Sequence, residues 1–452
     1  MPNPLLPAPT ARNALIAALI AAVLCCGALA SAAQNVIHAG TLLVKPGEAP
    51  LSEATVVIEN GLVQSVTEGY LSAVDLGLPE GAAVLDLRQR FVMPGFIDLH
   101  VHLSSEYDPD RQHYRVTKSD AYFALLGAEN ARKTLMAGFT TVRDLGSRGM
   151  AMFALRDAIA DGVVPGPKML VSGAPITPSG GHGDFHGYRP EVLAAMPAFG
   201  VCDGADDCRR AVRETVKRGA DVIKVTATGG VLSNTDTGTG KQFTDAELVA
   251  IRETAHSLGR KVTAHAHAKP GIEAALRAGF DSIEHSMWAD EDTMELFVET
   301  GAWMIPTVWP ITWVGDTPEK MAKGPFRNMP PAVMAKLLEL GSQPKTVVRM
   351  AREYGVKIAL GTDSGVSPHG TNANEFVEYV KAGMSPMEAL ETGTTLAAKA
   401  GGIDGVGTLE PGKAADLVGL AANPLENIEA VLTVDFVMRD GIVFKAQGAP
   451  TQ

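Results

Sequence analysis

Short apolar segments alternate with longer amphipathic segments through the middle of this chain, and this alternation constrains the fold more than any other feature. The apolar segments have the length of buried strands, and the amphipathic ones have helical periodicity. We predict eight strands, at residues 95–100, 140–144, 168–172, 221–225, 261–265, 282–285, 303–307 and 357–363. Clear helical patterns between them cover residues 245–258, 269–278, 332–354 and 385–400. Alternating units of this kind predict an α/β protein built on a parallel (β/α)8 TIM barrel.

Both ends of the chain carry shorter β-type patterns that lie outside the barrel. Asn60-Gly61 and Asp440-Gly441 stand between apolar runs, and both dipeptides are typical of β-hairpin turns. We therefore predict a small β-sandwich domain formed from both termini. The predicted parts are residues 34–92 and 403–452 for the β domain and residues 93–402 for the barrel.

The first 33 residues have the order of a secretory signal peptide. Arg12 is their one charged residue, an apolar run covers residues 14–24, and positions 28–33 hold small residues apart from Leu29. The run is also short for a membrane span. We expect the segment to be removed, which would leave a periplasmic or secreted protein without stable membrane association. An uncleaved N-terminal anchor is the alternative.

The composition excludes several classes of protein. The chain of 452 residues has 39 Lys and Arg against 51 Asp and Glu, so its net charge is −12. This acidic balance argues against a nucleic-acid partner, because nucleic-acid-binding proteins usually present a basic face. The proportions of 46% hydrophobic and 20% charged residues are ordinary for a globular protein and exclude a disordered chain.

Two cysteines would remain after signal cleavage, Cys202 and Cys208. Export permits disulfides, and two lone thiols in an oxidising compartment tend to pair. We therefore expect a local disulfide between them. A two-cysteine metal site is less favoured because no histidine stands nearby in the sequence, and a reactive nucleophile is the least favoured interpretation.

Residues able to bind a metal stand at or near the ends of five predicted barrel strands. The first strand ends in His100-Val101-His102, and alternation along a strand places both imidazoles on one face. An unpaired Lys in an apolar strand is costly to bury, so Lys224 needs a partner or a chemical change. Active sites of such barrels lie at the carboxyl ends of the strands. Together the set predicts a site for Zn²⁺ or a similar ion, formed by His100, His102, Lys224, His265, His285 and Asp363.

Three further residues are candidates for substrate binding. His265 and His267 share a face of their strand, so sequence geometry leaves open which is the ligand; we favour His265 and assign His267 to the substrate. His182 lies in a long glycine-rich loop that we expect over the barrel mouth. Arg143 could meet a substrate carboxylate, although its neighbour Asp144 is an equally good structural partner.

Several of these motifs resemble one known family. The run from Pro94 to His102 (PGFIDLHVH) looks like the opening motif of the amidohydrolase superfamily, and residues 407–417 are similar to the return into its β domain. Residues 264–267 and 279–285 resemble the branch of Xaa-Pro dipeptidases and imidazolonepropionase-like enzymes. That branch includes binuclear carboxypeptidases acting on N-acyl amino acids, and amidohydrolases that cleave ochratoxin A.

The resemblance implies a role for each ligand. His100 and His102 would hold one ion, His265 and His285 the other, and a carboxylated Lys224 would bridge the two Zn²⁺. Asp363 would complete the first site and act as the catalytic base for attack by a hydroxide shared by both ions. The implied reaction is hydrolysis of an amide next to a free C-terminal carboxylate, in dipeptides, N-acyl amino acids or ochratoxin A. Members of the branch are commonly homo-oligomers, so we expect one, with an octamer as a candidate.

Two other functions remain open at this point. An imidazolonepropionase-like cyclic amidase or a lactonase is the nearest rival, but mononuclear enzymes of that kind do not need a lysine such as Lys224. A metal-binding protein without catalysis is the rival from another class. Asp363 argues against it, because a binding site alone does not need that base.

Overall fold

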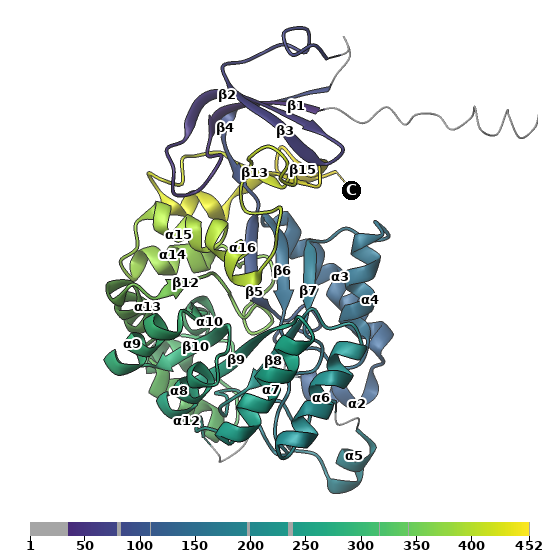
Figure 1. Cartoon of the computed structure of the whole chain (residues 1–452), viewed down its shortest axis with the longest axis vertical. Coiled ribbons are helices and arrows are strands. Elements are labelled where there is room, and N and C mark those ends of the chain that lie inside the picture. The colour runs from purple at the N-terminus through teal and green to yellow at the C-terminus, as the bar shows by residue number, and fades with distance from the viewer. Residues whose placement is uncertain are drawn as a thin grey trace, which may run out of the picture.

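The computed structural model describes residues 35–78, 83–108, 110–196, 199–233, 238–315, 317–341 and 343–451. The predicted signal peptide lies outside the described residues. Two units follow one another along the long axis of the molecule (Figure 1). A β-sheet from both ends of the chain lies at the top of that view, and strands surrounded by helices form the rest.

The upper sheet has eight strands in the order β16-β15-β14-β13-β4-β1-β2-β3. Both predicted hairpin turns are confirmed: the first joins β2 to β3 and the second joins β14 to β15. Asn60 and Asp440 adopt positive φ there, as such turns require. The sheet draws on both ends as predicted, while the second layer of a β-sandwich stays a prediction. Its strands are β1 (Asn35–Leu42), β2 (Leu51–Glu59), β3 (Leu62–Glu68), β4 (Ala83–Pro94), β13 (Leu417–Leu420), β14 (Val434–Arg439), β15 (Ile442–Ala446) and β16 (Ala449–Pro450).

The lower unit contains eight strands, which pair in parallel in the orders β5-β6-β7 and β12-β11-β10-β9-β8. Backbone hydrogen bonds cross both gaps between these sheets: Leu99 N–H donates to Leu360 O at 3.0 Å, and Ile176 N–H donates to Lys224 O at 2.7 Å. The strands follow the predicted order, and the α/β class is as expected. They are β5 (Phe96–Val101), β6 (Phe139–Asp144), β7 (Lys168–Val171), β8 (Val222–Thr226), β9 (Lys261–Ala268), β10 (Ser282–Trp288), β11 (Trp303–Ile305) and β12 (Lys357–Ile358).

Helices surround these strands, and apolar side chains between the two layers form the main core. Two long predicted helices are each divided in two. Gly341 has a φ of 47° and ends the first half of residues 332–354, and residues 385–400 divide at Gly393 and Thr394. The helices are α2 (Arg111–Thr117), α3 (Asp120–Met136), α4 (Ala151–Ala160), α5 (Pro190–Ala195), α6 (Ala205–Lys217), α7 (Asp245–Ser257), α8 (Lys269–Arg277), α9 (Glu291–Thr300), α10 (Trp309–Val314), α11 (Pro318–Met321), α12 (Pro331–Leu340), α13 (Gln343–Tyr354), α14 (Asn374–Lys381), α15 (Pro386–Thr392), α16 (Thr395–Gly401) and the 3-10 helix η1 (Ile428–Leu432).

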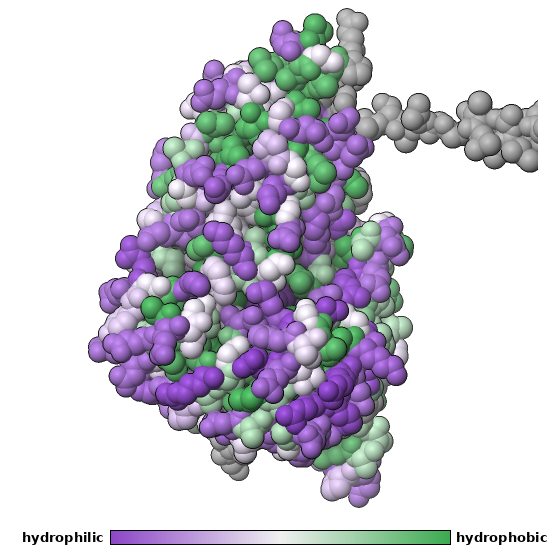
Figure 2. Space-filling model, viewed as in Figure 1, coloured by the Kyte–Doolittle hydropathy of each residue, from purple (hydrophilic) through white to green (hydrophobic). Residues whose placement is uncertain are grey.

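Because its strands are parallel, the lower unit has one end where the strands begin and another where they finish. β5 begins directly below the upper sheet, whereas α5 and α12 lie at the opposite end (Figure 1). Hydrophilic residues cover much of the visible face of the lower unit (Figure 2). Among the described residues, no helix combines the length and the apolar character that a membrane span requires.

Candidate metal centre and active site

Two histidines at the end of β5 converge on Asp363. His100 Nε2 lies 3.5 Å and His102 Nε2 lies 3.1 Å from the same Asp363 carboxylate oxygen. Asp363 follows β12, whose two-residue ladder is shorter than the predicted strand. Burial alone would raise the pKa of the Asp363 carboxyl, but the neighbouring His100 and His102 outweigh it and lower that pKa. The carboxylate is therefore ionised and able to accept a proton.

Three further imidazoles lie beside this group, on β9 and β10. The candidate ligand atoms of His265, His267 and His285 all lie within 4.8 Å of one another, and those of His100, His285 and Asp363 do the same. His285 belongs to both groups, so the two groups are adjacent. The structure brings His267 as close to His285 as it brings His265, and the choice between them as ligand stays open.

Lys224 reaches the same place from β8. Its side chain is 4% exposed, and its Nζ has no hydrogen-bond partner in the described part of the chain. Burial lowers the pKa of this amine to about 8, even though Glu284 and Asp363 act in the opposite direction. An orphaned buried amine among imidazoles and a carboxylate indicates that a further group belongs here. The donor set of nitrogen and oxygen atoms fits divalent ions such as Zn²⁺.

The backbone is strained at two of the candidate ligands and at a residue hydrogen-bonded to one of them. His285, Thr307 and Asp363 have φ values of 71°, 55° and 50°, in the left-handed region that residues other than glycine rarely adopt. A hydrogen bond of 2.7 Å joins His285 Nδ1 to Thr307 Oγ1 and orients that imidazole. Each such residue raises the conformational free energy of the folded chain by on the order of 1 kcal/mol or more, and strain of this kind clusters at functional sites.

A buried ion pair between Arg143 and Glu284 holds the candidate ligand His100 in position. Glu284 accepts from Arg143 at 2.9 Å and from His100 Nδ1 at 2.8 Å, and Arg143 also donates to Leu99 O at 2.7 Å. Burial would raise the pKa of Glu284, but Arg143 and His100 outweigh it and hold that pKa at about 2. The structure does not support the predicted substrate-binding role of Arg143. Arg143 is 2% exposed, and its guanidinium is bonded to protein atoms and paired with Glu284 rather than Asp144.

We expect Glu284→Gln to lower the free energy of unfolding by about 3 kcal/mol, because it leaves the buried Arg143 without a counter-charge. Urea-induced unfolding would measure the change. Glu214→Gln is the matched control, since Glu214 pairs with Arg210 on the exposed surface of α6 and should change stability little. Equal losses in the two variants would contradict the structural role of Glu284.

A cavity of about 1440 Å³ opens above the ligand cluster, and all the candidate metal ligands line it. His182 lies on its wall, as predicted for the loop after β7, and stacks on His265 with ring centroids 4.3 Å apart. Its Nδ1 bonds to Ser233 Oγ. Burial lowers the pKa of His182 to about 3, so the imidazole is neutral and can donate one hydrogen bond.

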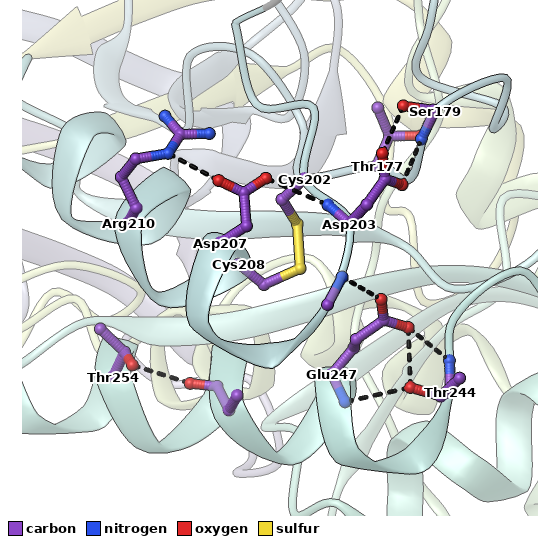
Figure 3. Close-up of a disulfide and its surroundings, with 12 residues drawn as sticks. Thr177, Ser179, Cys202, Asp203, Asp207, Cys208, Arg210, Thr244, Glu247 and Thr254 are labelled. Atoms are coloured by element: carbon purple, nitrogen blue, oxygen red, sulfur yellow. Dashed lines mark hydrogen bonds and ion pairs between the residues drawn. A yellow bond between two sulfur atoms is a disulfide. The ribbon is translucent and has the colours of Figure 1, made fainter.

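The loop that carries His182 is attached to the loop before α6 (Figure 3). Cys202 N–H donates to Thr177 O at 3.0 Å, and Asp203 accepts a hydroxyl hydrogen bond of 2.6 Å from Ser179. The predicted disulfide between Cys202 and Cys208 is confirmed and joins this loop to the first turn of α6. Closing a loop this short contributes about 2 kcal/mol in the chain-entropy description.

Comparison with known proteins agrees with this geometry. The model of the amidohydrolase family matches residues 91–443. The chain belongs to this family. Its strands are accordingly those of the family's α/β TIM barrel, and the protein is a metal-dependent hydrolase.

Relatives of this amidohydrolase cover nearly its whole length. Ochratoxinase from Aspergillus niger is 34% identical over 439 residues, which are 92% of this chain and 87% of that protein. A solved Xaa-Pro dipeptidase with methionine bound in its active site is 36% identical with a TM-score of 0.83, covering 91% of this chain and 100% of the other. A prolidase complexed with N-methylphosphonate-L-proline is 31% identical with a TM-score of 0.80, covering 92% and 100%.

The sequence interpretation missed two buried carboxylates of this amidohydrolase. Glu284 orients His100, while Asp98 accepts from the His100 backbone N–H at 3.0 Å and from Thr362 Oγ1 at 2.6 Å. Both are acidic residues inside apolar strands. The argument that singled out Lys224, that a buried charge needs a partner, applies equally to them and would have found both.

Proposed function

We propose that this protein is a binuclear zinc amidohydrolase that cleaves an amide bond next to a free C-terminal carboxylate. The observation that carries the proposal is the convergence of five imidazoles, Asp363 and an unpartnered Lys224 beneath one large cavity. Relatives named as ochratoxinase and as Xaa-Pro dipeptidase both support an amide substrate that ends in an amino acid. Ochratoxin A and dipeptides are therefore candidate substrates.

The residues present fit two ions. We assign His100, His102 and Asp363 to one ion, His265 and His285 to the other, and a carboxylated Lys224 between them. Carboxylation would turn the buried amine into an anion, which resolves the cost of burying an unpaired cation. Bound ions of this kind acidify water and polarise carbonyl groups.

The chain's own residues would supply the proton transfers and the orientation. Asp363, ionised and 18% exposed, would accept a proton from the attacking water and pass it to the leaving amine. Neutral His182 would donate to the carbonyl oxygen of the substrate from the cavity wall. Glu284 and Thr307 would hold His100 and His285 in the orientations that ligation needs.

The test is a hydrolysis screen of zinc-loaded protein with a chelator-treated control. The panel contains N-acyl amino acids, Xaa-Pro and other dipeptides, ochratoxin A, imidazolonepropionate and a lactone. Chelator-sensitive release of a C-terminal amino acid is the expected result. Turnover of the cyclic compounds alone would contradict the proposed substrate class and favour a cyclic amidase or lactonase.

We also propose that the protein is exported, since residues 1–33 have the order of a signal peptide and Cys202 is paired with Cys208. Protein isolated from its native cells should then begin near residues 32–34. N-terminal sequencing measures this directly. A chain that retains Met1 would refute cleavage.

A further inference from the structure

Three arginines line the cavity: Arg148, Arg115 and Arg218, the last with its guanidinium 3.6 Å from the centroid of the Phe199 ring. Arg148 follows β6, and Arg115 lies on α2. In the described part of the chain, no Asp or Glu oxygen lies within ion-pair distance of the guanidinium of Arg148 or of Arg115. The contact of Arg148 is instead a 2.9 Å hydrogen bond to Gly183 O, and its guanidinium stacks 3.4 Å from the centroid of the Phe185 ring. The arginine side of the cavity therefore has positive charge that no protein carboxylate neutralises by direct contact.

Two of the acidic residues that line the cavity are bonded to other donors. Glu106 pairs with Lys133 at 3.0 Å, and Asp184 accepts from the backbone N–H groups of Gly180 and Phe185 at 2.8 Å. Neither carboxylate is in ion-pair contact with Arg148, although the negative charge of Asp184 acts on that guanidinium from a distance. The guanidinium of Arg148 retains N–H groups that a bound anion can use.

Arg148 is connected to the metal centre on two sides. Two residues before it, Gly146 O lies 3.3 Å from His102 Nδ1. Its own acceptor, Gly183 O, belongs to the residue after His182, which stacks on His265. The loops after β6 and β7 therefore bring backbone atoms near Arg148 close to the ligand cluster, and its side chain lines the same cavity as the ligands.

The rest of the cavity has a different character. A compact apolar cluster forms another part of its lining, and we call it the apolar wall. Its members come from the loop after β8, from β10 and from the segment between β11 and α13, so they are distinct from the loops that hold Arg148. The apolar wall consists of Val231, Met287, Val314, Phe326, Leu337 and Leu340.

We propose that Arg148, with Arg115 beside it, binds the free carboxylate of the substrate while the apolar wall receives a bulky apolar acyl group. The inference rests on the proposed function and narrows its substrate class to N-acyl amino acids with a large hydrophobic acyl part. A guanidinium matches a carboxylate with two parallel hydrogen bonds. Burial and the nearby Arg115 lower the pKa of Arg148 to about 10, so it is still charged at neutral pH and gains from an anionic neighbour.

The test uses a ligand that cannot be hydrolysed. In 2-benzyl-4-oxo-4-phenylbutanoate a methylene group replaces the amide nitrogen of N-benzoylphenylalanine, and its carboxamide is the uncharged counterpart. Isothermal titration calorimetry on the zinc-loaded protein measures both. We expect the acid to bind at least about tenfold more tightly than the carboxamide, because a charged hydrogen-bonded pair is strong when shielded from water.

Arg148→Met should weaken binding of the acid about tenfold or more and leave the carboxamide nearly unchanged. Arg252→Met is the matched control, since Arg252 also donates to a backbone carbonyl, Ala278 O, but lies away from the cavity. An analogue with methyl in place of the benzoyl phenyl ring should bind roughly tenfold more weakly through loss of apolar burial.

A preference for the acid that survives in Arg148→Met would overturn the proposal, and so would equal binding of acid and carboxamide by the unmodified protein. Arg148→Lys provides the comparison if the methionine variant does not fold, and it should bind the acid with reduced affinity because it lacks the planar fork. Because these ligands are not cleaved, an inactive protein that still prefers the acid would refute the proposed reaction and leave the carboxylate site standing.

Discussion

Asp363→Asn should lower kcat about 10³-fold, within the range of 10²–10⁴ that a general base contributes. The amide has the size and one oxygen of the carboxylate, so the side chain can still approach the two histidines at the end of β5. It can no longer accept a proton. The ionised carboxylate, which lies 3.1 Å from His102, is the group placed to do so.

The measurement is steady-state hydrolysis of the best substrate in the screen, together with metal content and thermal unfolding. Asp245→Asn is the control, since Asp245 is an exposed carboxylate at the start of α7 and should leave kcat unchanged. Turnover near the original value in Asp363→Asn would remove this residue as the base. Loss of both metal and fold would show that it acts as a structural ligand instead.

Lys224→Ala should abolish tight metal binding and activity together, from about two ions per chain to fewer than one, because binding needs a complete and deprotonated ligand set. Lys224 is a buried group whose Nζ lacks a hydrogen-bond partner among the described residues, and it lines the cavity together with both ligand groups. Elemental analysis of purified protein would count the ions. Activity would be measured in parallel with added zinc.

Addition of bicarbonate tests more specifically whether Lys224 is carboxylated. If the amine is carboxylated, protein loaded with zinc in CO₂-depleted buffer should gain activity on addition of bicarbonate, and the alanine variant should not. Lys445→Ala is the control, because Lys445 is half-buried and donates to the carbonyls of Met136 and Val434 far from the cluster. A fully active, metal-replete Lys224→Ala protein would exclude the bridging role.

Much of the ligand cluster could be anticipated because strand geometry is local. His100 and His102 stand two residues apart, which places both on one face of a strand whatever the rest of the chain does. Lys224 and His285 follow or interrupt apolar runs, and the carboxyl ends of barrel strands meet at one end of the fold. The hairpin turns at Asn60 and Asp440 were predictable because turn geometry is local too. Such turns require positive φ, which few residue types other than Gly, Asn and Asp adopt readily.

The groups around the cluster could not be assigned in this way. Arg143 stands near the end of a barrel strand, where a substrate-binding residue would also stand. Only its contact with Glu284, from a strand far away in sequence, shows that it supports His100 instead. Conversely, Arg148 stands in an unremarkable loop. Its exposure to the cavity depends on how the loops after β6 and β7 pack together.

The sequence by itself therefore determined the α/β class, the order of the strands and the residues that end them, because these follow from periodicity and from the cost of burying polar groups. The tertiary structure alone decided which charges are paired and which face the cavity. That distinction rests on contacts between segments far apart in the chain, such as Arg143 with Glu284, whereas Arg148 meets no carboxylate among the described residues. A local sequence pattern does not reveal such contacts. Here they distinguish Arg143, which has a structural role, from Arg148, which we propose binds substrate.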